Sequence, residues 1–427
     1  MGLLQHVKKS EFIRHNAIYF VGSLTIGALN YLYYPVVGRL LQPSAFGEVQ
    51  TLVSLFLQIG IFMTVLGMLT INIITNYQSS QQRNRVITEL EKLSLLIGIV
   101  FFAAATLGRS WLQQYFQFQS SWPFVVLALA IVVTIPYAFR SGYLVGKKLF
   151  GLNAWAGISG AGSKLIFSFI LVAVGLGTTG ALAGILVAQA LMFTVTGYFA
   201  LRHGFHESFR LSVRPPDMQL IRPELKYAGL VLLGSLAITI MYSIDIVVVK
   251  HYFDAHTAGL YAGVATAARI IFFLTASVAQ VLMPSIKLSQ PPAKNRQVLK
   301  RSFGLVTLIG GATLAIFYMA PEFIVSVLMG STYSVYASLL PRLSIAVFVI
   351  SLLNLLMAYC LALRRYGAGI VAILGVVLTY GLMLAHHQSL EAVVSSLLYG
   401  SLAVGVAFAL WLMWTENKSS LTERGYK

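Results

Sequence analysis

The 427-residue sequence has few charged residues. Asp, Glu, Lys and Arg make up only 10% of the chain, whereas hydrophobic residues make up 58%. A soluble globular domain usually carries about a quarter charged residues. So few charges would not cover the water-facing surface of a soluble protein, and the mean hydropathy of +0.80 points the same way. The scarcity excludes a soluble globular protein and indicates an integral membrane protein.

Cysteine, histidine and acidic residues are also scarce. Cys360 is the only cysteine, which excludes a disulfide framework and a sulfur-ligated metal site. Of the 8 histidines, His203 and His206 have a spacing that could place them on one helix face, but no third ligand is near, so no metal is expected. The longest predicted outer loops, 109–122 and 321–336, lack the paired carboxylates that general acid–base catalysis needs. We therefore expect a protein that is not an enzyme; a membrane glycosyltransferase or polymerase is the enzyme alternative.

The sequence does contain a series of apolar runs of about 20 residues, each long enough to cross a bilayer as a helix. These runs predict an all-α integral membrane fold with about twelve transmembrane helices. The predicted spans are 16–36, 47–74, 90–108, 123–146, 151–174, 180–201, 226–249, 258–283, 303–320, 337–362, 367–385 and 391–414.

The net charge of +17 is distributed unevenly between the two sides of the predicted membrane. One side holds most of the 30 Lys and Arg, with clusters at Lys147–Lys148 and over 202–226; the other holds Arg39, Arg109, Lys250 and Arg342. The positive-inside rule then predicts a multi-pass protein of the plasma (inner) membrane with both termini in the cytoplasm. Anionic lipids are the expected partners of these cations. Nucleic acid is not needed to explain them.

The two halves of the chain share a pattern. The segment "NYLYYPVVGRLLQPSAFGEVQ" after the first span matches "MYSIDIVVVKHYFDAHTAGLYAG" after the seventh, pairing Arg39 with Lys250 and Gly47 with Gly259. Six spans repeated in one orientation predict a parallel pseudo-twofold repeat, which in transporters places the substrate between two lobes. The expected organisation is an N-terminal six-helix lobe (1–205), a cytoplasmic linker (206–225) and a C-terminal six-helix lobe (226–427).

Three cations lie well inside predicted spans, Arg140, Lys164 and Arg269, and Asp245 lies toward the outer end of the seventh span. A charge facing lipid at the bilayer centre costs roughly 2.5–3.5 kcal/mol on insertion scales. The cations should therefore face a hydrated cavity or have partners. Asp245 is either the partner of a cation elsewhere or a site for a coupling proton or Na⁺; no other cofactor is expected.

The stretch "GISGAGSK" that ends at Lys164 looks like a phosphate-binding loop. A P-loop needs lysine directly after the last glycine, but Ser163 separates Gly162 from Lys164, and an apolar span follows. The glycines are instead expected to allow close helix packing or to leave room around Lys164.

Polar and aromatic residues in the first two spans are further binding candidates. Thr51, Ser54 and Gln58 form a polar stripe at helical spacing, with Gln58 as the candidate ligand. Tyr31 and Tyr34 would stack on sugar rings or lie at the membrane interface.

Three stretches carry a resemblance to a known family: "RLLQPSAFGEVQTLVSL", "GYLVGKKLFG" and "IDIVVVKHYFDAHTAGLYAGVATAAR". They resemble the polysaccharide transporter family, the Wzx-type lipid-linked oligosaccharide flippases of the MOP superfamily, which are relatives of the MATE exporters. The resemblance implies two lobes in a MATE-like V and a cationic cavity that receives an undecaprenyl-pyrophosphate-linked oligosaccharide. It also implies alternating access from the cytoplasmic to the outer leaflet, and the polysaccharide biosynthesis machinery as a partner.

The family commonly has basic residues in spans five and eight and an acid in span seven, matched here by Lys164, Arg269 and Asp245. With Arg140, Tyr31, Tyr34 and Gln58, the two cations make up the predicted substrate site. Cations suit an anionic headgroup, whereas exporters that move cations would be expected to bury acids. A MATE-type antiporter of small molecules or ions is the alternative function.

Overall fold

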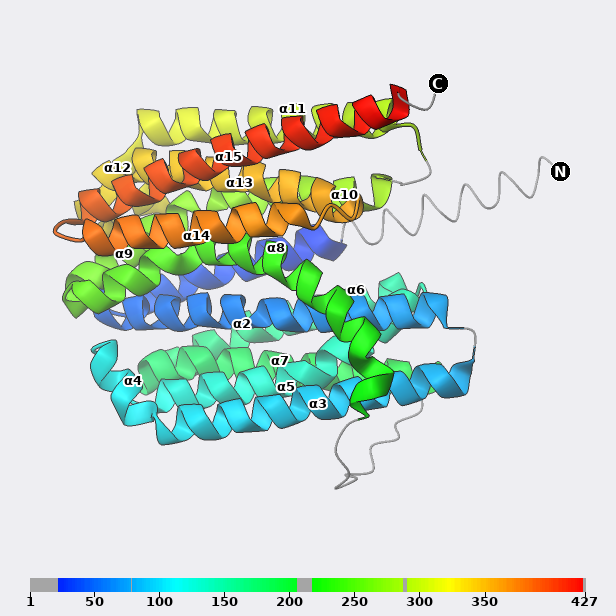
Figure 1. Ribbon diagram of the computed structural model, residues 1–427. Helices are drawn as coiled ribbons and strands as arrows, with labels where there is room; N and C mark the ends of the chain where they lie inside the picture. Colours follow the sequence, from blue (N-terminus) through cyan, green and yellow to red (C-terminus); the bar gives the residue numbers. More distant parts are fainter. Residues whose placement is uncertain (1–21, 78, 206–216, 287–289, 425–427) are drawn as a thin grey trace, which may run out of the picture. The chain divides into compact units, whose positions relative to one another are not determined.

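The computed structural model describes residues 22–77, 79–205, 217–286 and 290–424. Within these ranges the regular structure is helical and no strand occurs (Figure 1). The described residues contain nine helices that are long and apolar enough to cross a membrane, or ten if the bent pair α9–α10 is one span. The all-helical membrane fold is thus confirmed. The number of twelve spans, arranged in two six-helix lobes, stays a prediction.

The chain divides into two compact units, Met1–Ala228 and Gly229–Lys427. The predicted linker lies partly outside the described residues, at 206–216, and Met218–Leu225 belong to a long helix, α8. In the first unit a helix over 22–40 precedes α2 (Pro43–Asn76), α3 (Ser80–Leu107), α4 (Arg109–Tyr115), α5 (Trp122–Gly146), α6 (Phe150–Leu171), η1 (Val172–Leu176), α7 (Gly177–Arg202) and the start of α8 (Met218–Tyr252).

The second unit continues with the remainder of α8. It then contains α9 (Ala255–Ala268), α10 (Ile270–Ser285), α11 (Pro292–Met319), α12 (Pro321–Leu328), η2 (Ser331–Leu339), α13 (Leu340–Ala362), α14 (Gly367–Ala385) and α15 (Leu390–Arg424). The order of elements repeats that of the first unit. Helices α2, α3 and α4 begin at 43, 80 and 109, and α9, α11 and α12 begin at 255, 292 and 321, a constant offset of 212 (255 − 43 = 212).

The packing inside each unit also repeats. Helix α5 packs against α2, α3 and α7, and its counterpart α13 packs against α10, α11 and α15. In the first unit the α2–α5 contact depends on small residues, because a Cβ at Gly142 would lie 2.6 Å from the carbonyl oxygen of Gly67. Such close approach of backbones is the usual way in which membrane helices pack.

Helices α6 and α7 form an antiparallel hairpin. The segment Phe150–Arg202 has 53 residues, which as one straight helix would extend about 80 Å, far more than a bilayer core. Gly160 packs against Met192, and farther along α6 Leu171 packs against Gly180, so the two helices run in opposite directions. The turn at η1 contains Gly175 (φ 93°) and Gly177 (φ 50°), which adopt these values because they have no Cβ.

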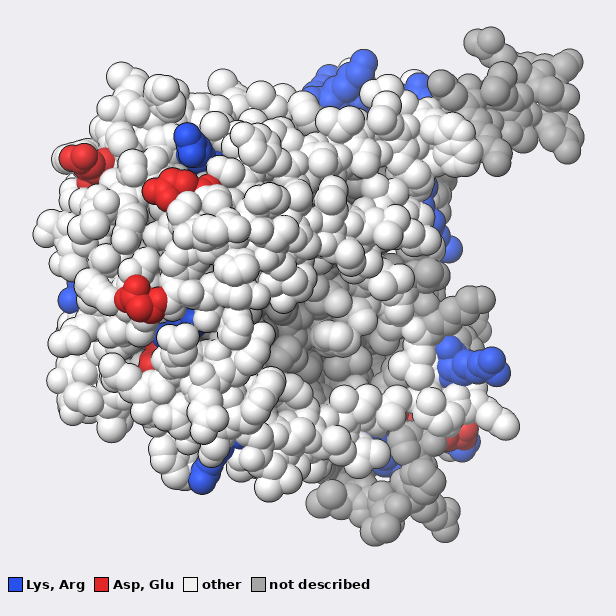
Figure 2. All heavy atoms as spheres, turned by 60° about the vertical axis from the view of Figure 1, so that its left-hand side comes forward, with Lys and Arg blue, Asp and Glu red and all other residues white. Residues whose placement is uncertain are grey.

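Large apolar side chains cover much of the outer surface. On α3, Ile97 and Val100 are exposed, and on α14 Ile370, Leu374 and Val377 are exposed. Figure 2 shows the consequence on one face, where most of the surface is white, without Lys, Arg, Asp or Glu. A soluble protein rarely exposes such continuous apolar surface. The surface is therefore that of a multi-pass membrane protein.

Candidate functional site

Lys164 is a cation inside a membrane span, and its contacts are polar but not acidic. It lies on α6, and its Nζ donates to Oδ1 of Asn30 at 2.6 Å. The ring of Tyr33 lies 4.5 Å from Nζ and the ring of Tyr34 lies 5.9 Å away. The residue is half-buried. An amide oxygen and aromatic faces contact the amine without supplying a full negative charge.

The glycines before Lys164 pack helices together. A Cβ at Gly157 would overlap Ile26 of the 22–40 helix, and a Cβ at Gly160 would overlap Met192 of α7. Beside Gly162 there is open space. The stretch is helical throughout, which confirms that it is not a phosphate-binding loop. Its small residues bring the 22–40 helix close enough for Asn30 to reach Lys164.

Arg140 on α5 is paired with an acid. Its Nη1 lies 2.8 Å from Oε1 of Glu91 on α3 and also donates to the carbonyl of Pro136. The guanidinium lies over the rings of Phe193 and Phe205. Both charged residues are buried. The pair is neutral overall, and its role within the first unit is to join α3 to α5.

Arg269 is paired in the same manner. It lies where α9 ends and α10 begins, at a bend of 40°. Its Nη2 lies 2.6 Å from Oδ1 of Asp245 on α8, and its Nε donates to the carbonyl of Tyr242. The hydroxyl of Tyr261 donates to the other carboxylate oxygen of Asp245. Of the two alternatives left open for Asp245, the geometry supports a partner for a cation.

The predicted site residues therefore fall into two groups. For a cation inside a span, the sequence left two alternatives, a hydrated cavity or an acidic partner. Arg140 and Arg269 have acidic partners, whereas Lys164 has no carboxylate among its contacts with described residues. Arg269 and Asp245 lie in the second unit, and Lys164 and Arg140 lie in the first. A substrate role for any of them stays a prediction.

The remaining predicted ligands lie in the first unit. Tyr31 meets Tyr34 edge-on with ring centroids 6.4 Å apart, and Tyr34 in turn meets Tyr33 at 5.4 Å. This tyrosine group therefore extends from Lys164 along the 22–40 helix. Gln58 is half-buried on α2, and Thr51 in the same stripe donates its hydroxyl to the carbonyl of Gly47.

Three polar residues have contacts or burial that were not expected from the sequence. Asn30 was overlooked although an amide in the first span is a readable signal. Lys250, the repeat mate of Arg39, has a side chain that is only 1% exposed, whereas Arg39 is exposed. Glu48, to which no role was assigned, is 3% exposed. The contact of Asn30 and the burial of Lys250 and Glu48 depend on helix packing that composition does not show.

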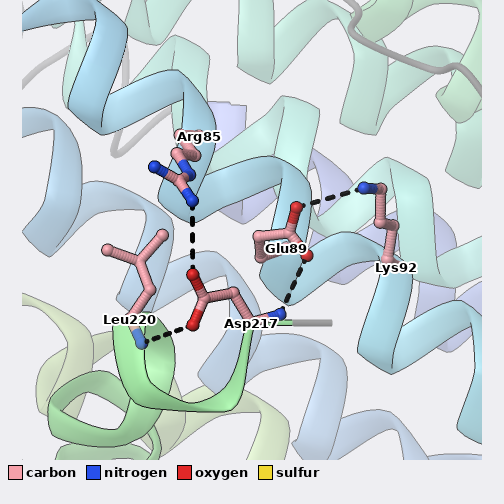
Figure 3. A network of polar contacts seen from close by, with 5 residues as sticks. All are labelled: Arg85, Glu89, Lys92, Asp217 and Leu220. Carbon is pink, nitrogen blue, oxygen red and sulfur yellow. Dashed lines mark hydrogen bonds and ion pairs between the residues drawn. The ribbon is translucent and has the colours of Figure 1, made fainter. Parts of the chain in front are cut away.

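The chain entering α8 is tied to α3 by a polar network (Figure 3). Asp217 receives the backbone N–H of Leu220 on Oδ1 and lies 3.3 Å from Nη2 of Arg85. The backbone N–H of Asp217 donates to Glu89, which also binds Lys92. These contacts place the end of the predicted linker on the first unit.

A second acid holds the next turn of α8. Buried Glu224 accepts hydrogen bonds from the hydroxyl of Tyr77 at 3.1 Å and from the amide of Asn72 at 3.3 Å. Burial, followed by the charge of Glu224, raises the pKa of Tyr77. The start of α8 is therefore joined to both α2 and α3.

The comparisons with known proteins agree with the sequence. Residues 36–338 match a family described as polysaccharide biosynthesis protein. The chain belongs to this family, and the resemblance drawn from the sequence is confirmed. In a direct comparison with curated proteins, nothing matches.

Solved structures with a similar fold are MOP-superfamily transporters. An inward-facing multidrug resistance MATE transporter is 15% identical with a TM-score of 0.73, over 94% of this chain and 96% of that one. The lipid II flippase MurJ, in an inward closed conformation, is 12% identical with a TM-score of 0.70, over 94% and 87%. A MOP-superfamily transporter from Pyrococcus furiosus, described as having a binding pocket of reverse polarity, is 16% identical with a TM-score of 0.61, over 93% and 94%. At these identities the likeness establishes the fold.

Proposed function

We propose that this protein is a flippase that moves an undecaprenyl-pyrophosphate-linked oligosaccharide from the cytoplasmic to the outer leaflet by alternating access. Lys164 is the residue that binds the pyrophosphate, and Tyr31 and Tyr34 stack on the lipid-linked sugars. The protein works in the plasma membrane, with both termini in the cytoplasm, beside the polysaccharide biosynthesis machinery.

The observation that carries this proposal is that Lys164, inside a membrane span, has no carboxylate among its contacts with described residues. An ammonium group costs several kcal/mol to desolvate unless something compensates it, and its contacts here are one amide oxygen and two tyrosine rings. A phosphate would supply the missing negative charge and would accept the ammonium hydrogens. Without an anion, Asn30 holds the Lys164 side chain in place through its hydrogen bond, so the site is preorganised for an anion.

Family membership and fold support the same conclusion. The family is described by polysaccharide biosynthesis, and the similar structures include a lipid II flippase. The family description concerns a glycan, and the flippase moves a lipid. A flippase needs a polar site that accepts a headgroup while an apolar exterior stays in lipid, and the exposed apolar residues of α3 and α14 provide such an exterior.

The alternative is a MATE-type antiporter of small molecules or ions, favoured by the similarity to multidrug MATE transporters. A site for organic cations would need an acid that is not already paired with a cation. Of the buried acids in the described part of the chain, Glu91 and Asp245 are paired with Arg140 and Arg269. In Glu48 and Glu224 both carboxylate oxygens already accept hydrogen bonds from neutral groups of the protein. The proposal therefore favours an anionic substrate.

The test is translocation by the purified full chain in proteoliposomes. A fluorescent undecaprenyl-pyrophosphate oligosaccharide is placed in one leaflet, and its arrival in the other is followed with a membrane-impermeant quencher. Lys164→Ala should abolish transport and Lys164→Arg should retain part of it, because arginine keeps the charge. Lys300→Gln, on an exposed part of α11, is the matched control and should transport normally. Normal transport by Lys164→Ala, or export of a cationic dye instead, would refute the proposal.

A further inference from the structure

The membrane-spanning helix α5 ends in a turn that contains a lysine in an unusual conformation. The backbone N–H of Lys148 donates to the carbonyl of Val145 at 2.9 Å, and that of Leu149 donates to the carbonyl of Leu144 at 2.8 Å. These two hydrogen bonds form a Schellman motif, in which the residue that follows the helix adopts the left-handed conformation. Lys148 accordingly has a φ of 62°. A lysine thus occupies a position where glycine is the usual residue.

The turn after α13, in the second unit, has the same hydrogen bonds. The backbone N–H of Arg364 donates to the carbonyl of Leu361 at 3.0 Å, and that of Arg365 donates to the carbonyl of Cys360 at 2.8 Å. Arg364 has a φ of 55°. Each unit therefore places a basic residue in the left-handed position of this turn.

The two turns occupy corresponding places in the repeat. Lys148 and Arg364 are 216 residues apart (364 − 148 = 216). The same offset relates Tyr143 to Tyr359, the buried tyrosines that precede them in the two helices (359 − 143 = 216). This offset exceeds 212 because the second unit has more residues between the start of α12 and its turn.

The left-handed conformation itself does not require a cation. A side chain is disfavoured there because its Cβ comes too close to the following carbonyl oxygen. After α7 the same motif is formed with Gly204, whose φ is 85°. Among the described residues, Gln117 after α4 is the other residue besides glycine with a positive φ. Lys148 and Arg364 are therefore kept at a cost to the backbone, which a function of their side chains would explain.

Both basic side chains are accessible to a ligand. Lys148 and Arg364 are exposed, and no ion pair between described residues includes either of them. A cation near the last turn also stabilises a helix through its dipole. In α5, however, Lys147 supplies that charge from a position with an ordinary φ of −80°. The charge of Lys148 thus remains for an anion outside the protein.

Apolar side chains on the next helices indicate the kind of anion. Helix α6 begins two residues after Lys148 and exposes Trp155, and α14 begins three residues after Arg364 and exposes Ile370 and Leu374. Both helices belong to segments that are long and apolar enough to cross the membrane, and tryptophan is enriched at the membrane interface. A molecule that places a phosphate at the turn and an acyl chain along the next helix is a phospholipid.

We infer that the turns after α5 and α13 are two binding sites for an anionic phospholipid, with Lys148 and Arg364 on the headgroup phosphate and the acyl chains along α6 and α14. Lysine supplies a point charge, and arginine supplies a pair of parallel donors. The positive-inside rule predicts both turns on the cytoplasmic side, where anionic lipids make the membrane surface negative. These sites are specific positions, unlike the general attraction of basic loops to lipid, and they do not depend on transport of a glycan.

Thermal unfolding of the purified full chain in detergent micelles tests the two sites. Phosphatidylglycerol should raise the wild-type unfolding temperature more than the same amount of phosphatidylcholine does, because a ligand of the folded state stabilises it. The double variant Lys148→Gly, Arg364→Gly should lose most of this difference. Glycine fits the left-handed position, so without phosphatidylglycerol this variant should unfold at the wild-type temperature or above it. A double variant that keeps the whole difference would overturn the inference.

Two matched variants separate a bound lipid from other causes. Gln117→Gly makes the same backbone change without removing a charge. Lys300→Gln removes one exposed charge from α11, as Lys148→Gly alone does from its turn. Both controls should keep the wild-type difference between the two lipids, whereas Lys148→Gly should lose part of it. An equal loss in Lys300→Gln would refute the sites, because net charge alone would then determine the effect.

Inorganic phosphate distinguishes a phospholipid from a free anion. Added to phosphatidylcholine micelles, it should leave the wild-type unfolding temperature unchanged. A rise as large as that with phosphatidylglycerol would mean that the turns bind free phosphate, and the phospholipid assignment would be wrong. No glycan is present in these measurements, so the lipid sites and the flippase activity can fail separately.

Discussion

The two units share one order of helices but differ in the polar residues at corresponding positions. With the offset of 212, Glu48 corresponds to Leu260, and Leu57 in the uninterrupted α2 corresponds to Arg269 at the α9–α10 bend. Both units bury a cation–acid pair, but Arg140–Glu91 joins α3 to α5 whereas Arg269–Asp245 joins α8 to the bend. The two units therefore share their helix packing, but their buried ion pairs lie at positions that do not correspond in the repeat.

The largest expected effect concerns the Arg269–Asp245 pair. Asp245→Ala should lower the free energy of unfolding by about 3–5 kcal/mol, because it leaves a buried arginine without its acid. Chemical unfolding in mixed micelles, followed by tryptophan fluorescence, measures this change. Adding Arg269→Met should recover much of the loss, since no unpaired charge remains. A double variant that is less stable than Asp245→Ala would contradict the assignment.

A smaller effect is expected at a glycine that differs between the units. Gly263 corresponds to Thr51, but a side chain at Gly263 would overlap the ring of Tyr333. Gly263→Thr should therefore cost about 1–3 kcal/mol, the usual cost of overpacking. Gly162→Ala is the control, because nothing lies within 4 Å of the added Cβ, and it should be neutral or stabilising by up to about 1 kcal/mol. Equal unfolding midpoints for both variants would show that the corner near Tyr333 is not tightly packed.

Helix caps provide the next comparison. Asp254 caps α9 by accepting the backbone N–H groups of His256 and Thr257 at 3.0 Å, whereas Gln42, its counterpart before α2, makes no side-chain cap. Asp254→Gln should cost about 1 kcal/mol and Gln42→Asp should gain a similar amount. Thermal unfolding scans of the two variants measure these changes.

The effect of Asp254 should also depend on pH. Hydrogen bonds from Thr257, and then from His256, lower the pKa of Asp254 in the folded state. Its contribution to stability is therefore complete above the unfolded value of about 3.9 and is lost as the pH falls through the lower folded pKa. A wild-type advantage over Asp254→Gln that persists unchanged in strong acid would contradict this cap.

The smallest effect on stability is expected at Lys164. Lys164→Met should change the free energy of unfolding by no more than about 1 kcal/mol, because the lost hydrogen bond to Asn30 is offset by removal of a half-buried charge. The same unfolding experiment compares this variant with Asp245→Ala. The difference between the two values distinguishes Lys164, a cation proposed to bind substrate, from Arg269, a cation whose pairing with Asp245 stabilises the fold. A loss at Lys164 as large as that at Asp245 would indicate a structural role.

Much of the fold was predictable from residues alone. The predicted spans 123–146 and 367–385 nearly coincide with α5 and α14, because apolar runs bounded by polar residues have few ways to be satisfied in lipid. The long α8 was harder to predict, since Met218–Leu225 are polar enough to suggest a linker. Contacts of Asp217 and Glu224 with α3 and α2 hold those residues in the helix, and such contacts are not encoded locally.

What the sequence by itself determined is the class of protein, its family and the presence of charges within the membrane, because hydropathy and the cost of burying a charge are properties of each residue in its own segment. Only the tertiary structure decided which charges neutralise one another. Glu91 and Arg140 are 49 residues apart in sequence, and Asn30 and Lys164 are 134 apart. Coulomb attraction and hydrogen bonding act over a few ångströms, so helix packing determines which cation has an acid beside it and which remains available for an anion.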